Sequence, residues 1–263
     1  MVNRHEVPLT PDLVLPRLRG RFGQPYLWSA SCSSTQDALR ERHLVEGAVA
    51  VTEHQTEGRG RHGRTWDDRA GTSLLLSVLL EPPDPASAGQ LSLVCALAVA
   101  ESVEGAIGGP AQVKWPNDVL VGGRKVAGIL LEGRDGAVVC GVGVNVDQDA
   151  AELPAAARVP AASLRTLTGR AHERVGVLVD LLELLEARYD LWLASGLMPL
   201  LPELERRDAL RGRPLTVGRV SGTANGIAAD GRLRVVGADG RETLVASGEV
   251  VSLPDFGRTA PSL

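Results

Sequence analysis

The sequence predicts an α+β protein, in which a mixed or antiparallel sheet flanked by helices is followed by a small β-barrel. Two long apolar segments, 91–107 and 175–196, are typical of helices that pack on a core. Short β-type runs separated by glycine turns occupy residues 112–146. After Asp208 the helical period ends, and four or five short β runs follow within about 50 residues.

The N-terminal region contains one apolar-periodic piece, from Leu13 to Leu18, among several prolines. This piece is too short and too interrupted for a helix-turn-helix domain. Ser33 is followed three positions later by Gln36, which predicts a capping box and a helix that extends to about Leu44.

The elements that follow alternate between strand and helix patterns. Residues 47–55 and 72–81 are predicted to be strands, and the second is apolar enough to be buried. The PPDPA segment at 82–86 predicts a turn. Residues 91–107 are apolar all round, which indicates a buried helix.

Glycine pairs divide the next region into a predicted antiparallel set of strands at about 118–121, 125–132 and 137–146. Residues 147–162 are predicted to form a mobile loop. The apolar spacing in 175–196 then predicts a strong helix.

The C-terminal region repeats Ala-Asp-Gly-Arg at 229–232 and 238–241, and Asp-Gly between β-type runs is a strong hairpin signal. We therefore expect a catalytic or binding domain at 1–207, a small β domain at 208–257 and a tail at 258–263.

The amino-acid composition limits the classes of function that the protein can have. The 263 residues are 44% hydrophobic and carry a net charge of −4, whereas general nucleic-acid binders are usually basic. Three widely spaced cysteines, Cys32, Cys95 and Cys140, predict reduced thiols and no zinc site. Neither a signal peptide nor a membrane span is indicated, so we expect a cytoplasmic protein. Among 28 Lys and Arg residues only Lys114 and Lys125 are lysines, which suggests that at least one serves chemistry.

The segment GRGRHGRTW, at 58–66, contains the G-x-G-x-x-G pattern of dinucleotide-binding loops. That motif requires a following helix, but the chain continues into a predicted strand, so the Rossmann interpretation fails. Glycines allow close backbone approach, and arginines recognise phosphate or carboxylate. The segment therefore predicts a flexible cationic loop over an anionic ligand, although a solvated turn remains an alternative. Trp66 is expected either to form a flat wall for a ligand ring or to pack in the core.

A second polar group occurs in KWPND, at 114–118. Lys114 with Asn117 and Asp118 is what a nucleotide triphosphate and Mg²⁺ require, although Asn117 and Asp118 also suit turn capping. Gly128 is expected to mark either a β-bulge or close approach of a ligand.

Five segments in order resemble the biotin protein ligase family: SSTQ (33–36), EHQTEGRGRHGRTW (53–66), KWPNDVL (114–120), KVAGILLE (125–132) and GVGVNV (141–146). The resemblance extends over about residues 30–255. It implies a catalytic domain related to class II aminoacyl-tRNA synthetases and lipoate ligases, followed by an SH3-like domain. It also implies formation of biotinyl-5′-AMP from biotin and MgATP, and transfer of biotin to a lysine of a biotin carboxyl carrier domain of a biotin-dependent carboxylase. No bound prosthetic group is implied.

The resemblance also assigns roles by position. Lys114 and Arg61 are expected to be catalytic, and the metal ligand is unknown, with Asp118 as a weak candidate. The expected biotin-binding residues are Ser34, Thr35, Gln55, Gly58, Arg59, Arg61, Trp66, Lys114 and Gly128. The expected ATP- or adenylate-binding residues are Arg61, Arg64, Lys114, Asn117, Lys125 and Asn145.

Two substitutions and one absence separate the chain from parts of that family. Gln36 stands where many members have Asn, and His62 where some have Arg. With about 30 residues before the first motif, the chain is expected to be of the monofunctional type, without operator DNA binding or membrane binding. A lipoate or octanoate ligase of the same fold remains the alternative. A nucleic-acid-binding module is disfavoured by the net charge and the 3% aromatic content.

Overall fold

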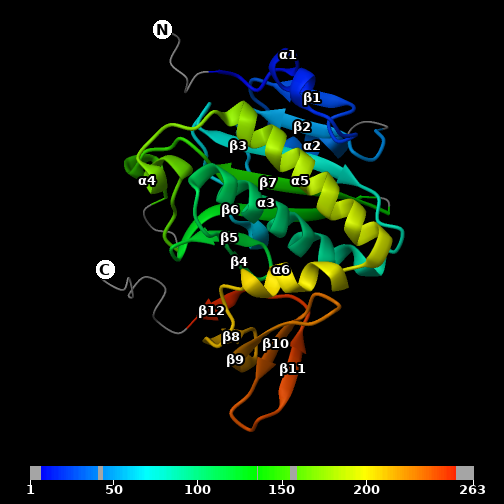
Figure 1. The fold of residues 1–263 in the computed structure, drawn as a ribbon, viewed down its shortest axis with the longest axis vertical. Coiled ribbons are helices and arrows are strands. Elements are labelled where there is room, and N and C mark those ends of the chain that lie inside the picture. Colours follow the sequence, from blue (N-terminus) through cyan, green and yellow to red (C-terminus); the bar gives the residue numbers. More distant parts are fainter. Residues whose placement is uncertain (1–6, 41–43, 135, 155–158, 253–263) are drawn as a thin grey trace.

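The computed structural model describes residues 7–40, 44–134, 136–154 and 159–252. These residues form one seven-stranded mixed sheet with helices on both faces and one five-stranded antiparallel sheet at the C-terminal end (Figure 1). The predicted α+β class is therefore confirmed.

The central sheet has the strand order β1-β2-β3-β7-β6-β5-β4. β1 and β2 are parallel, and every other neighbouring pair is antiparallel. Its strands are β1 (Tyr26–Ser29), β2 (Val49–Thr52), β3 (Ser73–Leu80), β4 (Gln112–Lys114), β5 (Asp118–Val121), β6 (Arg124–Arg134) and β7 (Ala137–Asn145).

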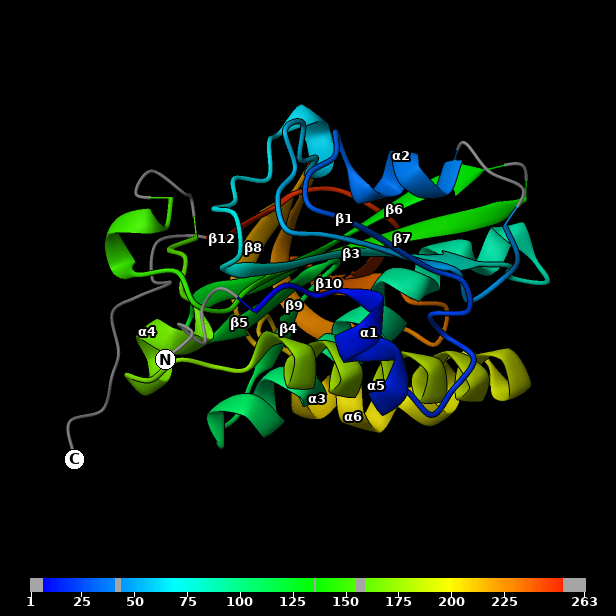
Figure 2. The same ribbon diagram turned by 90° about the horizontal axis from the view of Figure 1, so that it is seen from above.

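Helices cover the two faces of this sheet unequally. Figure 2 shows α3 and α5 below the sheet and the short α2 above it, beside the loop that follows β2. The upper face is therefore only partly covered, which leaves room for a site. The α helices are α1 (Pro11–Val14), α2 (Thr35–Arg40), α3 (Leu91–Ile107), α4 (Leu164–Thr168), α5 (Arg174–Ser195) and α6 (Leu201–Arg206). The 3₁₀ helices are η2 (Leu15–Arg17), η3 (Arg61–Gly63), η4 (Pro85–Gln90), η5 (Ala150–Glu152) and η6 (Met198–Leu200).

The predicted helix at 91–107 matches α3 at both ends. The helix ends at Gly108, which adopts φ 68° and donates its N–H to Glu104 O. Within the described residues, 85–107 is also the one helical segment long and apolar enough to cross a membrane. It packs against the sheet and α5, and most of its side chains are buried, so α3 is a core helix.

The smaller sheet has the order β11-β10-β9-β8-β12 and is antiparallel throughout. Both Ala-Asp-Gly-Arg repeats lie between paired strands, so the two predicted hairpins are confirmed. Closure of the sheet as an SH3-like barrel stays a prediction, as do the domain boundaries. The strands are β8 (Pro214–Val217), β9 (Val220–Ile227), β10 (Leu233–Val236), β11 (Glu242–Val245) and β12 (Val250–Ser252).

The predicted helix from Ser33 to Leu44 was too long. α2 covers only 35–40, and residues 41–43 lie outside the described residues. The predicted capping box was also wrong, because the Gln36 amide donates to Leu130 O at 3.2 Å. Gln36 therefore packs on the sheet instead of closing the helix.

Other differences concern short or irregular segments. The sequence did not predict β1, β4, α4 or α6, each of at most six residues. The helical elements of the described residues 7–25 are α1 and η2. In the predicted mobile loop Asp147 and Gln148 are buried, and residues 155–158 lie outside the described ones, as does the predicted tail.

Candidate active site

The floor of the site follows from the alternation of β7. Gly141, Gly143 and Asn145 lie on one face of the strand, and Val142 and Val144 lie on the other. Cross-strand pairing extends the same face, because Gly143 pairs with Gly128. The GVGVNV pattern thus places glycines where the partly uncovered upper face needs a shallow floor.

The Trp66 indole occupies part of this floor. A Cβ at Gly143 would lie 2.5 Å from the indole, and a Cβ at Gly128 would lie 3.0 Å from it. Lys125 Nζ lies at the same distance from this position, and close approach of a ligand to Gly128 stays a prediction. A β-bulge at Gly128 is excluded, because the register shift lies between Val119 and Leu120. Trp66 borders the cavity as predicted, and its Nε1 is buried with no hydrogen-bond partner among the described residues.

Neutral hydrogen-bonding groups gather above β3 and β7. Gln55 Oε1 accepts hydrogen bonds from Thr35 N at 2.9 Å and Thr35 Oγ1 at 3.3 Å. Thr35 Oγ1 also lies 2.8 Å from Ser77 Oγ. Ser34 is 2% exposed and borders the same cavity. Because the Gln55 oxygen is committed to Thr35, its NH₂ group is left as a donor for a ligand.

Cationic groups gather at the other side of the sheet, above β4 and β5. Asp118 Oδ1 lies 2.6 Å from Lys125 Nζ, and its Oδ2 lies 3.9 Å from Lys114 Nζ. Burial lowers the pKa of Lys114 below the ordinary 10.5, against the opposing effect of Asp118. The two lysines of the chain therefore share one carboxylate.

The loop tip crosses this cationic side. Arg61 Nη1 donates to Asn117 Oδ1 at 3.1 Å, and Asn117 Nδ2 donates to Ile129 O at 2.9 Å. Arg64 Nη1 pairs at 3.0 Å with Glu249 Oε1, which lies next to β12 of the smaller sheet. The tip is thus attached both to the central sheet and to the C-terminal sheet.

Two predicted biotin residues have other surroundings than expected. Arg59 donates to both carboxylate oxygens of Asp37 at 2.8 Å and also contacts Glu132. The Arg59 guanidinium lowers the pKa of the Asp37 carboxyl. Through these two carboxylates Arg59 anchors the loop to α2 and β6. Gly58 is buried behind the cavity wall, where a Cβ would lie 2.5 Å from Trp66 O. Gly58 does not border the cavity, and its contact with biotin stays a prediction.

One cavity of about 1010 Å³ joins the two sides. The neutral groups lie above β3, and the cationic groups lie above β4. These two strands are four strand spacings apart in the sheet, or roughly 19 Å. The cavity can hold an elongated ligand that is neutral at one end and anionic at the other. All predicted site residues except Gly58 border it.

The sequence missed the part of the wall that comes from the smaller sheet, namely Gly248, Glu249 and Val250. No local pattern marks these residues, because only the long-range packing brings them to the cavity. Pro154 and Ala161 also border the cavity and belong to the predicted loop at 147–162. Asn145, which was predicted to bind the adenylate, donates from Nδ2 to Ala162 O and thereby holds that loop.

The described residues contain no group of three or more His, Cys, Asp or Glu side chains that could hold a metal ion. Asp118, the weak candidate ligand, already pairs with Lys125.

Comparisons with known proteins find relatives of this chain in sequence and in structure. The profile of the Biotin/lipoate A/B protein ligase family matches residues 28–149. A biotin--[acetyl-CoA-carboxylase] ligase from Mycobacterium tuberculosis is 40% identical over 225 residues, which are 80% of this chain and 80% of that protein. The bifunctional ligase/repressor BirA of Bacillus spizizenii is 35% identical over 68% of this chain, but the match spans only 58% of BirA.

A solved structure shows the same architecture. The biotin protein ligase from Aquifex aeolicus in complex with biotin and ATP superposes with a TM-score of 0.79. The two sequences are 29% identical, and the match covers 86% of this chain and 97% of that one.

Proposed function

Because the chain belongs to the biotin protein ligase family, we propose that it is an ATP-dependent ligase that activates biotin and attaches it to a carrier protein. Biotin and ATP are its substrates, with Mg²⁺ accompanying ATP. The acceptor is a lysine of the biotin carboxyl carrier domain of a biotin-dependent carboxylase.

The observation that supports this proposal is the division of one cavity into neutral and cationic ends. The ureido ring of biotin is neutral and offers N–H and C=O groups, which suit Ser34, Thr35 and Gln55. Its carboxylate and the phosphates of ATP suit Lys114 and Lys125. Lipoate or octanoate carries no carbonyl acceptor at the distal end and would leave the NH₂ group of Gln55 without a ligand partner.

In the first half-reaction a carboxylate oxygen of biotin attacks the α-phosphorus of ATP, and the bond to pyrophosphate breaks. The carboxylate is already ionised at neutral pH, so this step requires no general base. Repulsion between two anions is the main obstacle. Lys114 and Arg61 offset it and stabilise the charge that develops on the phosphorus oxygens. Mg²⁺ neutralises phosphate charge when it is bound.

In the second half-reaction the carrier amine attacks the carbonyl carbon of the mixed anhydride, and the carbon–oxygen bond to AMP breaks. The amine loses a proton during this step. Asp118 is a candidate acceptor because it borders the cavity beside both lysines. We also propose that the loop 58–66 closes over the adenylate and shields it from water.

Arg61→Gly is expected to release biotinyl-AMP about tenfold faster, because it removes both a charge and the link from the loop tip to Asn117. Single-turnover release of labelled adenylate measures this effect. Arg61→Lys keeps the charge and should release the adenylate more slowly than Arg61→Gly. Equal release from both variants and from the wild type would show that the loop does not retain the adenylate.

The lowered pKa of Lys114 predicts an alkaline limit to adenylation. As pH rises through this pKa the ammonium loses its charge, so kcat/KM should fall at a pH below 10.5. Lys114→Arg keeps its charge over the whole range and should lack this limb. An unchanged pH profile in Lys114→Arg would assign the limb to another group.

The C-terminal sheet has a proposed role in completing the ATP side of the cavity. Glu249 pairs with Arg64, and Gly248 and Val250 lie in the cavity wall. We propose that residues 208–257 form the smaller domain and residues 1–207 the catalytic domain. We also propose a cytoplasmic location, which the ATP requirement and the free cysteines of the described residues support.

Transfer to a carrier tests the proposed function. The protein is incubated with biotin, MgATP and a biotin carboxyl carrier domain, and the domain is analysed by mass spectrometry. We expect one biotin adduct on the acceptor lysine and none when that lysine is replaced by arginine. Failure to modify the intact domain would contradict the transfer step.

A further inference from the structure

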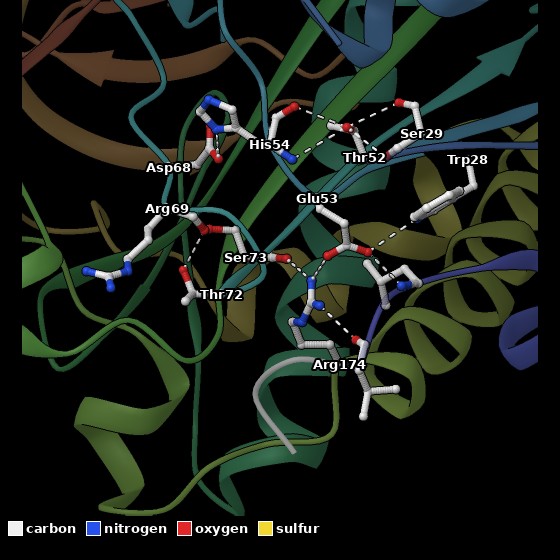
Figure 3. A network of polar contacts seen from close by, with 12 residues as sticks. Trp28, Ser29, Thr52, Glu53, His54, Asp68, Arg69, Thr72, Ser73 and Arg174 are labelled. Atoms are coloured by element: carbon white, nitrogen blue, oxygen red, sulfur yellow. Dashed lines mark hydrogen bonds and ion pairs between the residues drawn. The ribbon is translucent and has the colours of Figure 1, made fainter. Parts of the chain in front are cut away.

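Asp68 is a buried carboxylate at the base of the loop 56–67, and the mechanism above does not use it. Its side chain is 1% exposed, although its neighbours in the chain are exposed. Oδ2 lies 2.9 Å from His54 Nδ1, and Oδ1 accepts a hydrogen bond from Gln55 N at 3.3 Å. Figure 3 shows His54 and Asp68 side by side, apart from the pair formed by Glu53 and Arg174. One carboxylate therefore joins the two ends of the loop.

The position of Gln55 depends on contacts from two directions. Its side-chain oxygen is held by Thr35, and its backbone N–H is held by Asp68. Backbone hydrogen bonds also hold this segment, because Cys32 N donates to His54 O and Thr56 N donates to Cys32 O. Loss of the Asp68 contact would therefore shift Gln55 between these fixed neighbours, and its NH₂ group would move with it. A buried acceptor that fixes a ligand-binding residue from behind affects binding through geometry.

The tip of the loop is attached independently of Asp68. Arg59 pairs with Asp37, and Arg61 donates to Asn117. These links lie beyond the base of the loop, so they should survive a change at Asp68. Loosening of the base should therefore affect the neutral end of the cavity more than the cationic end.

We propose that Asp68 is a positioning residue that sets Gln55 for recognition of the biotin ring. The inference rests on the proposed function. It predicts that Asp68 acts on affinity for biotin and leaves affinity for ATP nearly unchanged. Its hydrogen-bonding geometry matters more than its charge, because Gln55 N requires only an acceptor.

Glu53 provides a matched control on the same strand extension. Its carboxylate accepts hydrogen bonds from Leu9 N at 2.6 Å and from Trp28 Nε1 at 3.3 Å, and it pairs with Arg174 at 2.7 Å. These partners hold the N-terminal segment and α5, and Glu53 does not border the cavity. Glu53→Gln therefore measures how much stability is lost when a buried carboxylate near the start of the loop is neutralised.

The test is calorimetric titration of biotin into the full-length protein, with the KM for ATP measured in pyrophosphate exchange and the fold checked by thermal unfolding. Asp68→Ala should raise the Kd for biotin about tenfold and change the KM for ATP less than about twofold. Asp68→Asn keeps an acceptor for Gln55 N and an NH₂ group for His54, and should restore most of the affinity. Glu53→Gln should lower the melting temperature without changing the Kd for biotin.

Unchanged biotin affinity in a folded Asp68→Ala protein would overturn the proposal. Equal losses of biotin and ATP affinity would overturn it too, because they would indicate a purely structural role. If Asp68→Ala does not fold, His54→Ala serves as the second variant, since the His54 side chain is 40% exposed. It should weaken biotin binding selectively, because Asp68 loses one of its two partners. A wild-type protein that binds no biotin would instead contradict the proposed function.

Discussion

Lys114→Ala is expected to lower the rate of biotin adenylation by about 10²- to 10³-fold, which is the usual cost of removing one charge-stabilising donor from an active site. Lys114 is 7% exposed, lies on β4 beside Asp118 and borders the cavity. Its ammonium is placed where negative charge from two anions accumulates. The rate of pyrophosphate exchange at saturating biotin and ATP measures the effect.

The control for this variant is Arg219→Ala. Arg219 is exposed in the turn between β8 and β9, so both variants lose one positive charge. Arg219→Ala should keep the wild-type rate, and both proteins should show cooperative unfolding. A Lys114→Ala protein with wild-type exchange would show that another group supplies the catalytic charge.

Gly143→Ala is expected to weaken biotin binding by at least about tenfold, because the new methyl group occupies space that the Trp66 indole now fills. The added Cβ would lie 2.5 Å from the ring, so Trp66 must move toward the cavity. Overpacking of this kind also destabilises the fold by about 1–3 kcal/mol. Titration of biotin and chemical unfolding measure the two effects.

Gly105→Ala separates the local clash from a general effect of replacing glycine. Gly105 lies in α3, and no atom lies within 4 Å of the Cβ it would carry. This variant should bind biotin normally and should gain up to about 1 kcal/mol in the free energy of unfolding. Normal biotin binding by Gly143→Ala would show that Trp66 is not part of the binding site.

Sequence reasoning succeeded where a pattern is long or where glycine enforces a turn. The apolar run of α3 ends at Gly108, and the hairpin between β5 and β6 turns at Gly122 and Gly123, both with positive φ. It failed for β1 and β4, which have only four and three residues and, unlike the equally short β5, are not followed by a glycine turn.

In the site too, sequence patterns predicted some features and missed others. The motifs placed nearly every predicted residue at the cavity, but the local pattern did not reveal what each side chain contacts. From the sequence alone, Arg59 and Arg61 are indistinguishable arginines of one cationic loop. In the structure Arg59 pairs with Asp37 and Glu132, whereas Arg61 donates a hydrogen bond to Asn117. Glu249, 185 residues after Arg64, carries no local signal at all. These contacts depend on the folded arrangement of distant segments.

Substrate-dependent exchange of labelled pyrophosphate into ATP tests the central claim most directly, because it reports formation of the acyl-adenylate without any carrier protein. The account predicts rapid exchange with biotin and MgATP, and no exchange with lipoate or octanoate in place of biotin. Absence of exchange with biotin, or exchange supported by lipoate or octanoate instead, would contradict it.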